Sequence, residues 1–164
     1  MIAAREGTVV ISSALFAFLH HLAAFGLVAA LAIELVLLRQ PLTVQSVRAL
    51  LRADMLYGIA AAVVLTVGAL RVLFFEKGVQ YYMHSVPFVV KVTLFAVVGV
   101  LSIRPTMTFL SWRGAVVQGQ APVVDEPKIK ALRRLVHLEL AAVAGILLCA
   151  ALMARGLGSG LSLG

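Results

Sequence analysis

The chain has 164 residues, of which 62% are hydrophobic and 13% are charged. A typical soluble domain is about 45–50% apolar and about 25% charged, and it leaves about a third of its unfolded surface in water. A soluble fold of this size could not bury so much apolar surface, and the mean hydropathy of +1.06 gives the same indication. The apolar excess excludes a disordered chain, and the single cysteine, Cys149, excludes a disulfide-bonded secreted scaffold. The composition predicts one polytopic membrane domain over residues 1–164.

Basic residues outnumber acidic ones, with 14 Lys and Arg against 7 Asp and Glu, for a net charge of +7. In a soluble protein this excess would suggest nucleic-acid binding. Here the basic residues lie at the ends of apolar segments, so they indicate membrane topology. We therefore expect a lipid bilayer, and no nucleic acid, as the partner.

Four segments are long and apolar enough to cross a bilayer as helices, which takes about 20 residues each. They cover residues 9–38, 56–75, 86–103 and 135–153. The first exceeds this length, so we expect it to tilt or to emerge at one end. The predicted fold class is all-α, a polytopic membrane four-helix bundle. Residues 156–164 are rich in Gly and Ser and predict a mobile tail.

The third segment is followed by Arg104 and Pro105, which predict a kink or a stop at the membrane surface. Residues 106–117 are expected to form a short interfacial helical extension, with Trp112 and Arg113 as anchors.

The distribution of Lys and Arg predicts the orientation. One side of the predicted bundle has nine basic residues: Arg39, Arg48, Arg52, Arg104, Arg113, Lys128, Lys130, Arg133 and Arg134. The other side has five: Arg5, Arg71, Lys77, Lys91 and Arg155. The positive-inside rule assigns the first group to the cytoplasm and predicts that both termini lie on the opposite side.

Two adjacent histidines, His20 and His21, lie in the outer half of the first segment. Adjacent residues of a helix point about 100° apart, so one of the two can face the bundle. His20 shares its stripe with small residues and with Glu34, which favours His20 as the inward residue. A hydrogen bond to a neighbouring helix and a role as ligand or proton carrier are both open for it.

Lys91 lies about one turn into the third segment, at the depth predicted for His20. Its amine either snorkels to the interface or faces His20 across the bundle. Arg71 lies near the same surface.

A second polar layer is predicted toward the cytoplasm. It consists of Glu34, Asp54, Arg104, His137 and Glu139. The simplest interpretation is an ion-pair network that joins helix ends, and a proton path between the two layers is the alternative.

Several short strings together resemble a family of small four-helix bacterial inner-membrane proteins, a domain of unknown function. The strings lie at residues 19–25, 52–54, 57–58, 75–78, 81–82, 87–88, 91, 94–95, 101–106 and 112–113. The resemblance covers nearly the whole chain except the tail. It implies a bacterial inner (plasma) membrane, with both termini on the periplasmic side.

More distantly, the layout is similar to the membrane protoporphyrinogen oxidase of bacteria and to the copper-resistance D domain. That oxidase binds haem b and depends on a histidine in its first helix and a lysine in its third. His20 or His21, together with Lys91, occupy the corresponding places, although Pro87 stands where an aromatic residue is usual. The resemblance implies haem b or a porphyrin, with His20 as the metal ligand. Lys91 could ligate the iron when deprotonated, which burial would favour; otherwise its charge, with that of Arg71, could pair with the haem propionates.

Three functions follow from these expectations. The first is haem or porphyrin binding for electron transfer or tetrapyrrole oxidation. The second is a non-catalytic accessory or structural subunit, either in a homo-oligomer or in a larger membrane complex. The third is a permease for small ions or metals, which four helices could form only as an oligomer.

Overall fold

The protein is described here from a computed structural model that covers residues 2–75 and 85–155, so the predicted tail at 156–164 lies outside the described residues. Within these ranges the chain forms four long helices and one π-helical turn. They are α1 (Ile2–Leu37), α2 (Val44–Leu70), η1 (Arg71–Phe75), α4 (Val86–Val117) and α5 (Glu126–Ala154). Each long helix is long and apolar enough to cross a membrane, which confirms the predicted all-α fold with four spans.

The helix α2 begins well before the predicted apolar span at 56–75, because its start is set by a cap rather than by hydropathy. The Thr43 Oγ1 accepts a hydrogen bond from the Ser46 amide at 3.1 Å, and the Ser46 Oγ accepts one from the Thr43 amide at 2.8 Å. This reciprocal capping box satisfies two backbone donors that would otherwise lack partners. The more polar stretch before residue 56 is therefore helical.

Of the kink or stop predicted at Arg104 and Pro105, the stop is wrong, because α4 continues through Pro105 to Val117. Residues 106–117 are helical as predicted, but Trp112 does not anchor a membrane surface. Its ring is buried within the bundle and packs against Phe109, with 5.6 Å between the ring centroids. This burial explains why the helix continues, since the turns after Pro105 supply core side chains.

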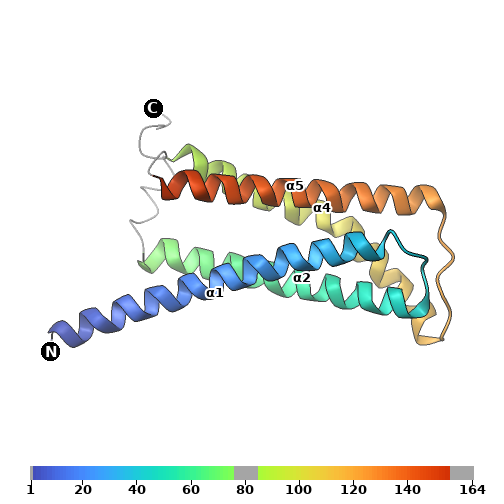
Figure 1. The fold of residues 1–164 in the computed structure, drawn as a ribbon, viewed down its shortest axis with the longest axis horizontal. Helices are drawn as coiled ribbons and strands as arrows, with labels where there is room; N and C mark the ends of the chain where they lie inside the picture. The colour runs from blue at the N-terminus through green and yellow to red at the C-terminus, as the bar shows by residue number, and fades with distance from the viewer. Residues whose placement is uncertain (1, 76–84, 156–164) are drawn as a thin grey trace.

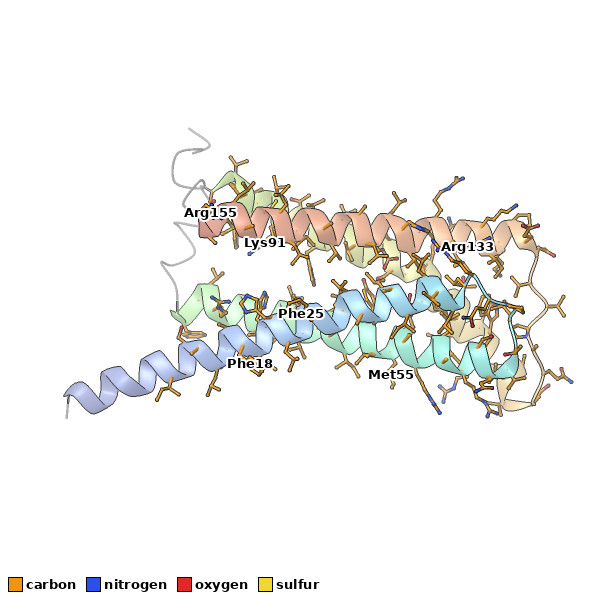
Figure 2. The ribbon with its side chains drawn as sticks, in the orientation of Figure 1. Phe18, Phe25, Met55, Lys91, Arg133 and Arg155 are labelled. Carbon is orange, nitrogen blue, oxygen red and sulfur yellow. The ribbon has the colours of Figure 1, made fainter. Side chains whose placement is uncertain are left out.

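The helices form an antiparallel bundle in which each one packs beside the next, and α5 returns to pack on α1. Figure 1 shows the pair α1 and α2 close to the pair α4 and α5 near the connections at residues 38–43 and 118–125. The two pairs separate toward the other end, where α1 begins and α5 ends (Figure 1). Lys91 and Arg155 lie toward that end, and Arg133 lies toward the connections (Figure 2).

The protein core lies near the connections. Val47, Leu50, Phe109 and Val136, from three different helices, have no exposed area. Away from this core the outer faces are apolar, as Phe18 and Phe25 illustrate with 66% and 74% of their surface exposed (Figure 2). Such large exposed apolar faces suit a lipid environment.

Candidate functional site

Three acidic side chains from three helices are buried inside the bundle, near enough to interact electrostatically. Glu34 of α1, Asp54 of α2 and Glu139 of α5 are 2%, 8% and 1% exposed. Glu34 lies close enough to interact electrostatically with both other carboxyl groups. We refer to Glu34, Asp54 and Glu139 as the carboxyl cluster.

The carboxyl cluster has few hydrogen-bond donors. The Thr106 hydroxyl of α4 donates to Asp54 Oδ1 at 2.6 Å, and the Tyr57 phenol interacts with Glu139 and with Ser102. One oxygen of each glutamate, Oε1 of Glu34 and Oε1 of Glu139, is buried without a hydrogen-bond partner among residues 2–75 and 85–155.

In the described part of the chain, no basic residue forms an ion pair with the carboxyl cluster. Two residues of the predicted polar layer, Arg104 and His137, are exposed instead. His137 donates from Nδ1 to the Arg133 carbonyl at 2.6 Å and accepts from Arg39 Nη2 at 3.4 Å. The structure thus brings together the three acids of the predicted layer but not its two basic residues.

Helix geometry explains this division. Arg104 is two residues before Thr106, and His137 is two residues before Glu139, so the members of each pair point about 200° apart. Because Thr106 and Glu139 face the bundle, Arg104 and His137 face away from it.

An isolated buried carboxylate is costly in an apolar interior. Three buried carboxyl groups that interact with one another, without a basic partner among the described residues, must therefore hold protons or take up a cation to limit their negative charge. This requirement is the clearest chemical feature of the described residues.

A cavity of about 330 Å³ adjoins the carboxyl cluster between α1, α2 and α4. Its polar lining comes from Asp54, Tyr57, Ser102 and Thr106, and its remaining lining is apolar. Tyr57 connects the cavity with the deeper Glu139. Tyr57, Ser102 and Thr106 were not predicted to have a role. The spacing of Asp54 and Tyr57, and of Ser102 and Thr106, is that of neighbours on one helix face and could have indicated them.

A separate group of nitrogen-bearing side chains lies toward the other end of the bundle. His20 is half-buried, and both Arg71 and Lys91 are near enough to interact with it electrostatically. His21 is exposed, and its Nδ1 donates to the Ala17 carbonyl at 2.7 Å. The structure thus places His20 against neighbouring helices and His21 on the surface.

The His20 ring packs tightly on α2. Its Cε1 lies 3.3 Å from the position that a Cβ at Gly68 would occupy, and its Nδ1 lies 3.7 Å from that position. The ring also interacts with the Val64 carbonyl, one turn away on the same helix. Its Nδ1 is enclosed and has no hydrogen-bond partner.

The Nδ1 atoms of both histidines face protein: that of His20 is covered by α2, and that of His21 is bonded to its own helix. Metal-bound histidines commonly bind through one ring nitrogen and donate the other to a backbone carbonyl, so Nε2 is the nitrogen that the His21 arrangement leaves for a ligand role. The described residues contain no group of three His, Cys, Asp or Glu side chains placed to hold a metal ion together.

Comparisons with known proteins give one match. A family model described as "Predicted membrane protein (DUF2214)" matches residues 12–158. No curated protein and no solved structure matches the chain, so the distant similarity to protoporphyrinogen oxidase and the copper-resistance D domain gains no support. The match covers most of the chain and agrees with the four apolar helices, and the protein therefore belongs to the DUF2214 family of predicted integral membrane proteins.

Proposed function

We propose that this protein holds exchangeable protons at the carboxyl cluster and releases them as it binds a cation, as cation-coupled transport requires. The observation that supports this proposal is the burial of Glu34, Asp54 and Glu139 together, without a basic partner among the described residues. Ionisable residues inside a membrane protein commonly mark pathways of ions or protons. A purely structural network would pair these acids with Arg or Lys.

The position of the carboxyl cluster suits exchange with one side of the membrane. Asp54 follows Arg52 by two residues, and Glu139 follows Arg134 by five, which corresponds to about 3 Å and 8 Å along a helix. If these arginines mark the cytoplasmic surface of a bacterial inner membrane, the cluster lies about half a turn to one and a half turns below it. We include this orientation, with both termini periplasmic, in the proposal. A path through the whole membrane would require a second copy or a larger complex.

The first test measures whether the cluster holds protons. Dicyclohexylcarbodiimide, an apolar reagent, modifies protonated carboxyl groups in apolar surroundings. We expect mass spectrometry of the treated protein to find the label on the carboxyl cluster. Glu126 is a matched control on the same protein, because it is exposed and pairs with Lys130 at 2.9 Å. An unlabelled cluster in folded protein would contradict the proposal.

The second test measures transport. Vesicles containing the purified protein and an internal pH dye are given a membrane potential, and the rate of proton movement is followed. We expect movement above that of empty vesicles, and its loss in Glu139→Gln, which keeps the shape of the side chain but cannot exchange a proton. Equal rates of proton movement in protein-containing and empty vesicles would mean that the carboxyl cluster binds protons without transporting them.

A second candidate function is haem or porphyrin binding for electron transfer. It is favoured by the convergence of His20, Arg71 and Lys91, since two cations could pair with propionates beside an imidazole. It would require the His20 ring to turn away from Gly68. Protein purified from haem-replete cells should then show a Soret band that His20→Ala removes, and a colourless protein would exclude this function.

A further inference from the structure

The cavity beside Asp54 differs in character from the carboxyl cluster it adjoins. Its walls include Leu27, Ala61, Phe95 and Val98, all apolar. Asp54 is the member of the carboxyl cluster that lines it. A site of this kind offers one negative charge at the edge of an apolar, partly aromatic space.

We propose that the cation bound by this protein is an organic ammonium ion with an attached apolar group, held in this cavity with its charge against Asp54. The inference rests on the proposed function and adds the substrate class to it. Ligand cavities commonly have about 300–1,000 Å³ and combine apolar walls with a few polar groups, and this cavity has about 330 Å³.

The lining favours an organic cation over a metal ion. Ca²⁺ takes about six to eight oxygen ligands and Mg²⁺ about six, whereas Asp54 is the sole carboxylate in the described lining of the cavity. One of its oxygens already accepts the hydrogen bond from Thr106. An ammonium ion needs fewer ligands, and the rings of Phe95 and Tyr57 can attract a nearby cation through their π faces.

Two glycines line the cavity, Gly58 of α2 and Gly99 of α4, and a Cβ added at either would meet no heavy atom within 4 Å. Larger side chains can therefore be introduced at the edge of the cavity without displacing a neighbouring helix. Both glycines and Met55 are exposed, so the cavity opens on the outer face of the bundle, where an apolar cation dissolved in the bilayer could enter.

The other cavity described near this end of the bundle has the opposite charge. It is lined by Val44, Gln45, Arg48, Ala49 and Arg52 and has about 490 Å³. Its two arginines would repel a cation, so the ammonium ion is assigned to the cavity beside Asp54.

The test uses benzyltrimethylammonium and its uncharged carbon isostere, neopentylbenzene, with the purified full-length protein in detergent. Calorimetry should detect binding of the cation, and binding of the isostere should be at least about tenfold weaker because it lacks the charge attracted by Asp54 and by the aromatic rings. Asp54→Asn should weaken cation binding by about tenfold or more, because it removes the negative charge. Gly58→Val and Gly99→Val should weaken binding by narrowing the cavity at its edge.

Gly114→Val is the matched control. Gly114 is an exposed glycine of the same helix as Gly99, with no heavy atom within 4 Å of an added Cβ, and it lies outside the cavity. Its substitution should leave binding unchanged. Equal binding of cation and isostere, unchanged binding in Asp54→Asn, or no binding to the unmodified protein would overturn the inference.

Carbodiimide labelling of the same samples separates this inference from the proposed function. A labelled carboxyl cluster together with absent ammonium binding would overturn the substrate class alone. An unlabelled cluster would overturn the proposed proton exchange, whatever the calorimetry shows. Bound benzyltrimethylammonium should also protect Asp54 from the reagent.

Discussion

The hydrogen bond from Thr106 to Asp54 connects α4 to α2 inside the bundle, and its removal gives the sharpest test of how the carboxyl cluster is held. Thr106→Val keeps the shape of the side chain but removes the hydroxyl that lies 2.6 Å from Asp54 Oδ1. Hydrogen bonds between membrane helices contribute about 0.6 kcal/mol on average and up to about 1.7, and those to charged groups about 1.5–3. Because Asp54 is buried, we expect the free energy of unfolding to fall by about 1–2 kcal/mol.

Unfolding can be followed by the fluorescence of Trp112, the single tryptophan of the chain, as the fraction of SDS in mixed micelles is raised. Its indole is buried against Phe109, so unfolding changes its surroundings. The variants Thr106→Val, Asp54→Ala and their combination form a double-mutant cycle. We expect a coupling energy of about 1 kcal/mol. Strict additivity of the two single losses would refute the reasoning, since it would mean that the hydroxyl does not stabilise the carboxyl group.

Three further predictions use the same preparation or whole cells. Phe109→Ala should lower the free energy of unfolding by about 3–5 kcal/mol, because it leaves a cavity in the core. Phe18→Ala, at a largely exposed ring, should change the same free energy by no more than about 0.5 kcal/mol. Similar losses in the two variants would contradict the packing. Gly145→Ala should change the free energy of unfolding by no more than about 1 kcal/mol in the same assay, because the helix propensity gained offsets a small shift of the flexible Leu94 Cδ1, which would lie 3.0 Å from the new Cβ; a loss above about 2 kcal/mol would contradict this. A cysteine placed at Gln120, in a background without the native cysteine, should react with an impermeant maleimide only after bacterial spheroplasts are permeabilised, and labelling of intact spheroplasts would reverse the proposed orientation.

The four spans could be predicted from the sequence because a bilayer demands a minimum apolar length, and hydropathy reports that length directly. The ends of the helices could not be predicted in this way. The start of α2 depends on the pairing of Thr43 with Ser46, and the continuation of α4 beyond Pro105 depends on burial of Phe109 and Trp112. The start of α2 is set by local hydrogen bonds and the length of α4 by packing. Mean hydropathy over a segment reports neither of them.

The three acids of the carboxyl cluster could be placed at one level because antiparallel helices of known direction bring Glu34, Asp54 and Glu139 to similar depth. Their lack of basic partners among the described residues could not be predicted from depth in the membrane. Arg104 and His137 lie at the same depth as the three acids. Their side chains point away from the bundle, however, and direction around the helix decides which side chains are in contact. The cavity was also beyond prediction, since it depends on which faces of α1, α2 and α4 meet.

Pro105 lies between the two parts of α4 that line the cavity, with Gly99 and Ser102 before it and Thr106 directly after it. A proline has no amide hydrogen, so the backbone carbonyl one turn earlier lacks its usual helical hydrogen bond. We therefore expect α4 to bend most easily at Pro105, beside the cavity. Any bending strain imposed on this helix, by lipid or by a neighbouring subunit, concentrates where Thr106 contacts Asp54.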